Sequence, residues 1–95
     1  MNIPKMIKIG GLNFDVKQVS EIEGRGDEPF SAIINFDDCE IIINKNINEQ
    51  YKEVLLLHEI IHGVCAYSGL QEEEEFVERL AYGLHQVCKD NKLVF

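Results

Sequence analysis

The first part of the chain alternates apolar and polar positions with the period of two that is typical of β-strands. Residues 12–17 alternate regularly and follow a Gly-Gly pair at 10–11, which indicates a hairpin with the short alternating run 7–9. The polar segment 23–29 contains two glycines and a proline, and it is predicted to be a loop.

A second hairpin is predicted from the apolar runs 30–36 and 39–44, which Asp37 and Asp38 join. Within the later run the isoleucines 41–43 are consecutive, so we expect this strand to be covered on both faces. Two successive hairpins predict a small antiparallel sheet of about four strands.

The second part of the chain has the spacing of helices. Residues 50–67 contain no proline and a single glycine, and apolar side chains surround much of the predicted helix, which indicates a central and buried position. Asn46 or Asn48 can cap the beginning of this helix. Gly69 is suited to its end, because helices commonly stop at a left-handed glycine.

A second helix is predicted over residues 72–89. Four consecutive glutamates, 72–75, fall in its first turn, where the helix dipole favours negative charge. Its apolar residues form one stripe, as in an amphipathic helix: Phe76, Val77, Leu80, Leu84 and Val87. The chain is therefore predicted to form one α+β domain, residues 1–95, in which the sheet packs on the buried helix and on the second helix.

The charge balance excludes some classes of partner. The chain has 9 basic and 17 acidic residues and a formal net charge of −8, whereas nucleic acids and anionic membrane surfaces attract clustered lysine and arginine. No apolar run approaches the roughly 20 residues of a membrane span. The three cysteines have no CxxC spacing and no secretory signal precedes them, so we expect a cytoplasmic protein with reduced thiols.

The chemistry of the chain is concentrated in the run His58-Glu59-Ile60-Ile61-His62. Residues four apart on a helix are separated by about 40° around its axis, so both imidazoles project to one side and can share one Zn2+ ion. Glu59 is rotated by about 100° from His58, where it can reach a water on the metal as a general base. Burying these groups without a metal would leave costly unsatisfied polar atoms.

A third ligand is required, because catalytic zinc usually has three protein ligands and a water. The second helix offers Glu72, Glu73, Glu74, Glu75 and Glu78, with Glu74, Glu75 and Glu78 as the ligand candidates. Individually, Glu72, Glu73 and Glu75 are expected to be solvated residues at the start of the helix. Glu74 and Glu78 are four apart and share a face. We predict Glu74 as the ligand, and Glu78 as an outer carboxylate that hydrogen-bonds a ligand histidine.

These residues resemble a known family. A His-Glu-x-x-His helix followed by a glutamate on a second helix resembles the gluzincin plan of zinc peptidases. More closely, residues 57–62 together with Glu74-x-x-Val77-Glu78-x-Leu80-Ala81 are similar to the ImmA/IrrE family of small bacterial and phage metallopeptidases, over roughly residues 39–89. The second helix of that family typically reads Glu-x-x-Ala-Asn-x-Phe-Ala, so three positions here depart from it. The resemblance implies a minimal zincin-like core.

We therefore expect a zinc-dependent metallopeptidase that cleaves a specific protein or peptide. An extended substrate can add to an exposed strand, for which residues 39–44 are the candidate. Alternatives are a zinc-binding regulatory or protein-interaction module without activity, and a metal-free interaction domain. The pattern does not predict the oligomeric state. Candidates for an oxyanion stabiliser are Tyr67, Tyr82 and His85, whereas Cys65 is expected to fill apolar space.

Overall fold

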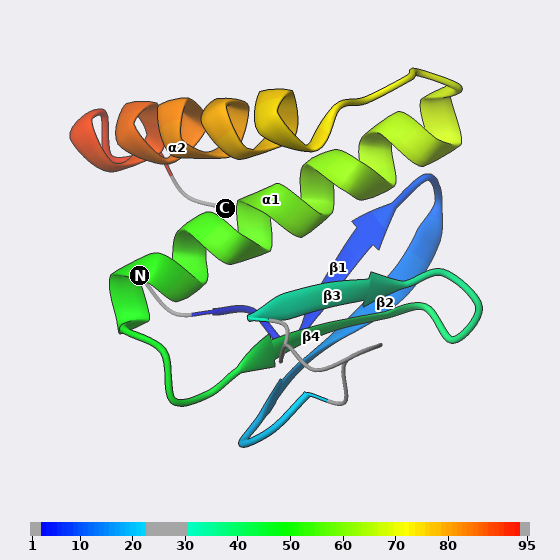
Figure 1. The fold of residues 1–95 in the computed structure, drawn as a ribbon, viewed down its shortest axis with the longest axis horizontal. Helices are drawn as coiled ribbons and strands as arrows, with labels where there is room; N and C mark the ends of the chain where they lie inside the picture. Colours follow the sequence, from blue (N-terminus) through cyan, green and yellow to red (C-terminus); the bar gives the residue numbers. More distant parts are fainter. Residues whose placement is uncertain (1–2, 23–30, 94–95) are drawn as a thin grey trace.

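The fold consists of four strands followed by two helices, in a computed structural model that describes residues 3–22 and 31–93 (Figure 1). The bounds of the elements are β1 Met6–Ile9, β2 Leu12–Val19, β3 Ala32–Asn35, β4 Glu40–Asn44, α1 Glu49–Ser68 and α2 Glu74–Asp90. The predicted α+β class is confirmed. The predicted loop 23–29 lies outside the described residues.

The sheet is mixed, and the prediction of an antiparallel sheet is wrong at one pairing. The strand order is β1-β2-β4-β3, and β2 pairs with β4 in parallel, with Val16 opposite Ile41. The other two pairings are antiparallel, as expected of hairpins. The chain leaves the end of β2, crosses to the far edge to form β3, and returns as β4 between them. In the second hairpin, the later strand β4 therefore lies inside the sheet and the earlier strand β3 lies at its edge.

The apolar run in β4 explains this arrangement. Ile41 and Ile43 are completely buried, whereas Ile42 on the other face is only half-buried. An interior strand pairs on both sides and buries more apolar surface than an edge strand does. Each Å² of apolar surface buried stabilises the fold by roughly 25 cal/mol. Both helices lie on the same side of the sheet (Figure 1), so the expected cover on both faces of β4 is wrong.

The structure has three layers, with α1 between the sheet and α2 (Figure 1). Leu55 and Leu56 of α1 pack in the cluster formed with the strands. Leu57 and Ile61 pack on the other side, in the cluster that contains Val77 and Ala81 of α2. Because α1 is buried on two sides, its apolar residues lie nearly all round the helix.

Helix α2 contacts α1 and not the sheet, among the described elements. This placement corrects the prediction that the sheet packs on both helices. Of the predicted stripe only Val77 is buried, together with Ala81. A single helix cannot cover the whole stripe, so its other members are exposed: Phe76, Leu80, Leu84 and Val87.

The ends of α1 follow the predicted capping. Asn48 is the N-cap, and its side-chain oxygen accepts hydrogen bonds from the backbone of Gln50 and Tyr51. Gly69 has the left-handed conformation at the other end, and the N–H of Leu70 donates to the carbonyl of Cys65. These caps fix where α1 stops, and therefore where the connection to α2 begins.

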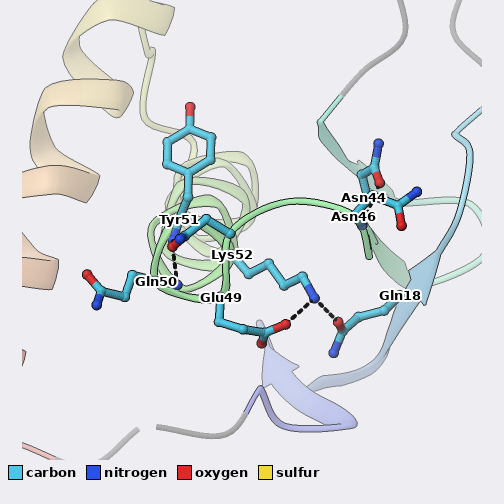
Figure 2. Close-up of polar contacts among 8 residues, drawn as sticks. Gln18, Asn44, Asn46, Glu49, Gln50, Tyr51 and Lys52 are labelled. Carbon is cyan, nitrogen blue, oxygen red and sulfur yellow. Dashed lines mark hydrogen bonds and ion pairs between the residues drawn. The ribbon is translucent and has the colours of Figure 1, made fainter.

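A buried lysine attaches the first turn of α1 to the sheet (Figure 2). The side chain of Lys52 is 3% exposed, and its Nζ donates to Gln18 of β2 at 2.9 Å and to Glu49 at 2.6 Å. A buried ammonium is tolerated only when it is paired and hydrogen-bonded. Lys52 therefore helps to set how α1 crosses the sheet.

No helix in the described part of the chain combines the length and the apolar character needed to cross a membrane.

The turn between β1 and β2 offers a test of the contact with the end of α1. A Cβ built on Gly10 would lie 2.7 Å from ring atoms of Tyr67, whereas one on Gly11 meets nothing within 4 Å. Both glycines have positive φ. Gly11→Ala should lower the free energy of unfolding by about 1–2 kcal/mol through backbone strain alone. Gly10→Ala should lower it by about 1–3 kcal/mol more because of the clash, as measured by urea unfolding. Equal losses would show that Tyr67 does not pack on this turn.

Candidate metal centre

His58 and His62 lie one turn apart on α1, on the strip of the helix between its sheet-facing and α2-facing sides. Their side chains are 14% and 17% exposed. The Nε2 atoms of the two rings are 3.0 Å apart. The four-residue spacing therefore brings the two imidazoles together, as the sequence predicted.

Glu74 completes a group of three ligand atoms. It is the first residue of α2, and its side chain is 68% exposed. Its Oε1 atom lies 2.5 Å from Nε2 of His58, and its Oε2 atom lies 3.0 Å from Nε2 of His62. One ligand atom from each of the three residues lies within 4.8 Å of the others.

The donor set of this group could hold a metal ion. Two imidazole nitrogens and one carboxylate oxygen are the ligands of the His2Glu class, which leaves a fourth position for water or substrate. Three groups that converge in this way, with both Nε2 atoms beside the same carboxylate, fit a single small divalent cation.

A second carboxylate contacts the outer side of His62. Nδ1 of His62 forms a hydrogen bond with Oε1 of Glu72. The prediction gave this kind of contact to Glu78. Glu78 is exposed on α2, and the contacts described for the two histidines do not include it. The outer role of Glu78 therefore stays a prediction without a contact to support it.

The start of α2 explains why Glu72 and Glu74 act together. The predicted helix began at Glu72, but the structure begins it at Glu74, with Glu73 as an extended N-cap at φ −105° and ψ 140°. In extended backbone, alternate side chains point the same way, whereas in a helix residues two apart lie about 200° apart. The glutamates on either side of Glu73 therefore both face α1. The signal in the sequence for this arrangement was a pair of glutamates two residues apart, one on each side of the residue that caps the second helix.

Glu59 follows His58 on α1 and is buried. Its residue exposure is 7%. Burial raises the pKa of its carboxyl group to about 7, an effect that the nearby His62 opposes and the charges of Glu74 and Glu72 reinforce. A carboxyl group with a pKa near neutrality can both accept and return a proton at physiological pH.

The pair formed by His62 and Glu72 is stabilised in its charged form. Burial disfavours the ionised Glu72, but the hydrogen bonds from His62 and Cys65 outweigh it, and the pKa of Glu72 is below its ordinary value. Burial likewise lowers the pKa of His62, yet the hydrogen bond to Glu72 and the neighbouring carboxylates leave it raised.

His58, His62 and Glu74 line a cavity of about 390 Å³ that lies between α1, the connection to α2, and strand β3. Its lining is polar on the helix side and apolar on the strand side: Ala32, Ile33, Ile34, Phe36, His58, Glu59, His62, Ala66, Glu72 and Glu74. Strand β3 is an edge strand of the sheet. The candidate ligands thus share this cavity with the edge strand β3.

The three oxyanion candidates are outside this lining. Tyr67 packs edge-on against Phe14 and Phe36. Tyr82 lies beside Tyr51, with ring centroids 6.5 Å apart. His85 is 3.0 Å from the buried carboxylate of Glu53, where it links α2 to α1. Cys65 is buried, as expected, and burial together with the neighbouring Glu72 raises the pKa of its thiol.

Comparisons with known proteins do not identify the chain. No family model matches it, and no curated protein and no solved structure matches it either.

The raised pKa of Glu59 predicts a pH-dependent cost in stability. The folded state holds this proton up to about pH 7 and the unfolded chain only to about 4.5, so folding is weakened as pH rises through this window. In metal-free protein, Glu59→Gln should raise the free energy of unfolding at pH 8 by up to about 3 kcal/mol. The gain should vanish near pH 4.5, as followed by urea unfolding at both pH values.

Glu73→Gln is the matched control for this measurement, because Glu73 is exposed and its side chain forms no capping hydrogen bond. It should change stability little at either pH. A gain for Glu59→Gln that is the same at both pH values would contradict the assignment of the raised pKa to Glu59.

Proposed function

We propose that the protein is a zinc-dependent metallopeptidase that hydrolyses peptide bonds of a specific protein or peptide substrate. The observation that carries the proposal is the convergence of Nε2 of His58, Nε2 of His62 and the carboxylate of Glu74 beside the buried Glu59. When bound, Zn2+ supplies Lewis acidity, which activates water and polarises a carbonyl group. The resemblance of residues 57–62 to the ImmA/IrrE family supports the same conclusion.

Glu59 moves the proton in this proposal. Glu59 lines the same cavity as His58 and His62, which is the space that a substrate would enter. At neutral pH its raised pKa lets the ionised form take a proton from the attacking water and the protonated form give that proton to the leaving amine. His58, His62 and Glu74 hold the metal, and they take no proton in the reaction.

Strand β3 is the proposed platform for the substrate. Of residues 39–44, the candidate from the sequence, Glu40–Asn44 form β4, which is an interior strand paired on both sides. The bond from the N–H of Asn44 to the carbonyl of Ser31 fixes the antiparallel pattern, so the backbone groups of Ala32 and Ile34 face outward. Both residues line the cavity, and an extended peptide added there would cross the metal group.

We also propose that the protein acts in the cytoplasm. All three cysteines are free, which suits a reducing compartment such as the cytoplasm. The ImmA/IrrE family, which the motif resembles, contains small bacterial and phage metallopeptidases, and we propose that this protein is a metallopeptidase of the phage or prophage type.

The proposal is tested by metal content and cleavage measured together. The purified protein should bind one Zn2+ per chain, and His62→Ala should reduce zinc affinity by at least about 100-fold, because two ligands alone hold zinc weakly. Glu59→Gln should keep the zinc and lose at least about 100-fold of the activity, as expected for loss of a general base. Cleavage is measured by mass spectrometry on a library of proteome-derived peptides, with Glu59→Gln as the blank.

Absence of bound zinc in wild-type protein would refute the proposal. Stoichiometric zinc with the same cleavage products from wild type and Glu59→Gln would instead support the alternative of a zinc-binding regulatory module without catalytic activity.

A further inference from the structure

The connection between the two helices carries a carboxylate that the proposed ligand set does not use. Glu72 lies on this connection, two residues before α2, and its side chain is 26% exposed. It bonds Nδ1 of His62. Glu72 is therefore held by His62 of α1, whereas no side-chain hydrogen bond is described for the neighbouring Glu73.

A carboxylate at Nδ1 decides which nitrogen of the ring carries the proton. A neutral imidazole has one N–H and one lone pair, and an ionised carboxylate can only accept. The ring must therefore place its proton on Nδ1, which leaves the lone pair on Nε2. Nε2 is the atom that faces Nε2 of His58 and the carboxylate of Glu74.

We propose that Glu72 is the positioning residue of the metal centre, which fixes His62 as the Nδ1–H tautomer and aims its Nε2 lone pair at the metal position. The inference rests on the proposed function, because the metal gives the orientation its purpose. Glu72 touches neither substrate nor metal in this role, and it acts only through the imidazole ring.

The two histidines differ in this respect. Both described contacts of His58 involve its Nε2 atom, and neither involves Nδ1. Only His62 has a carboxylate on its outer nitrogen among the described contacts. The effect of removing Glu72 should therefore be confined to His62, and His58 serves as a reference within the same molecule.

The first test reads the tautomer in metal-free protein by nitrogen-15 NMR of the histidine rings, above the pH at which the rings ionise. In wild type, His62 should be predominantly the Nδ1–H form. Glu72→Ala should shift His62 toward the Nε2–H form and leave His58 unchanged. The matched control Glu73→Ala removes the same charge from the next residue and should leave both rings as in wild type.

The second test measures zinc affinity by competition with a chelator. Glu72→Ala should weaken zinc binding by about 10–100-fold relative to Glu73→Ala, the usual effect of losing an outer partner of a ligand histidine. Glu72→Gln keeps the size of the side chain and a carbonyl acceptor, so its loss should be smaller. It also serves as the folded variant if the alanine form does not fold.

Failure of this inference is distinguishable from failure of the proposed function. A wild-type protein without zinc affinity would overturn the metal centre, and the tautomer measurement would still report on Glu72. Zinc bound as tightly by Glu72→Ala as by Glu73→Ala, or an unchanged His62 tautomer in Glu72→Ala, would overturn the positioning role while the metal centre stands.

Discussion

The burial of α1 on two sides is the constraint on which the rest of the structure depends. The strands cover Leu55 and Leu56, and α2 covers Leu57 and Ile61. His58 and His62 lie on a strip of α1 between these two faces. The core thus holds the helix rigidly while it presents two imidazoles to one cavity, which is what a metal site needs from its scaffold.

The second constraint is where α2 begins. One extended residue, Glu73, precedes the helix and turns the side chains on both sides of it toward α1. One of them joins the ligand atoms and the other reaches the outer nitrogen of His62. The capping glycine at position 69 sets the start of this connection, so the geometry of the site depends on how α1 ends as well as on the histidine spacing.

The buried Glu59 places chemistry and stability in opposition. A carboxyl group at 7% exposure resists ionisation, which raises its pKa to about 7 and weakens the metal-free fold above that pH. The same shift would suit the proton transfer proposed for this group near neutrality. A positive ion held by the adjacent histidines and Glu74 would favour the ionised form, so metal binding and folding should support each other.

The amino-acid sequence by itself determined the order of strands and helices, the end of α1 at Gly69, and the pairing of His58 with His62, and it limited the N-cap of α1 to Asn46 or Asn48. These features depend on local periodicity, backbone preference and helical spacing, which act over a few residues. The parallel pairing of β2 with β4, the exposed stripe of α2 and the contact of Glu72 with His62 were decided by the tertiary structure. Each depends on which surface is buried against which, and residues far apart in the chain supply that surface.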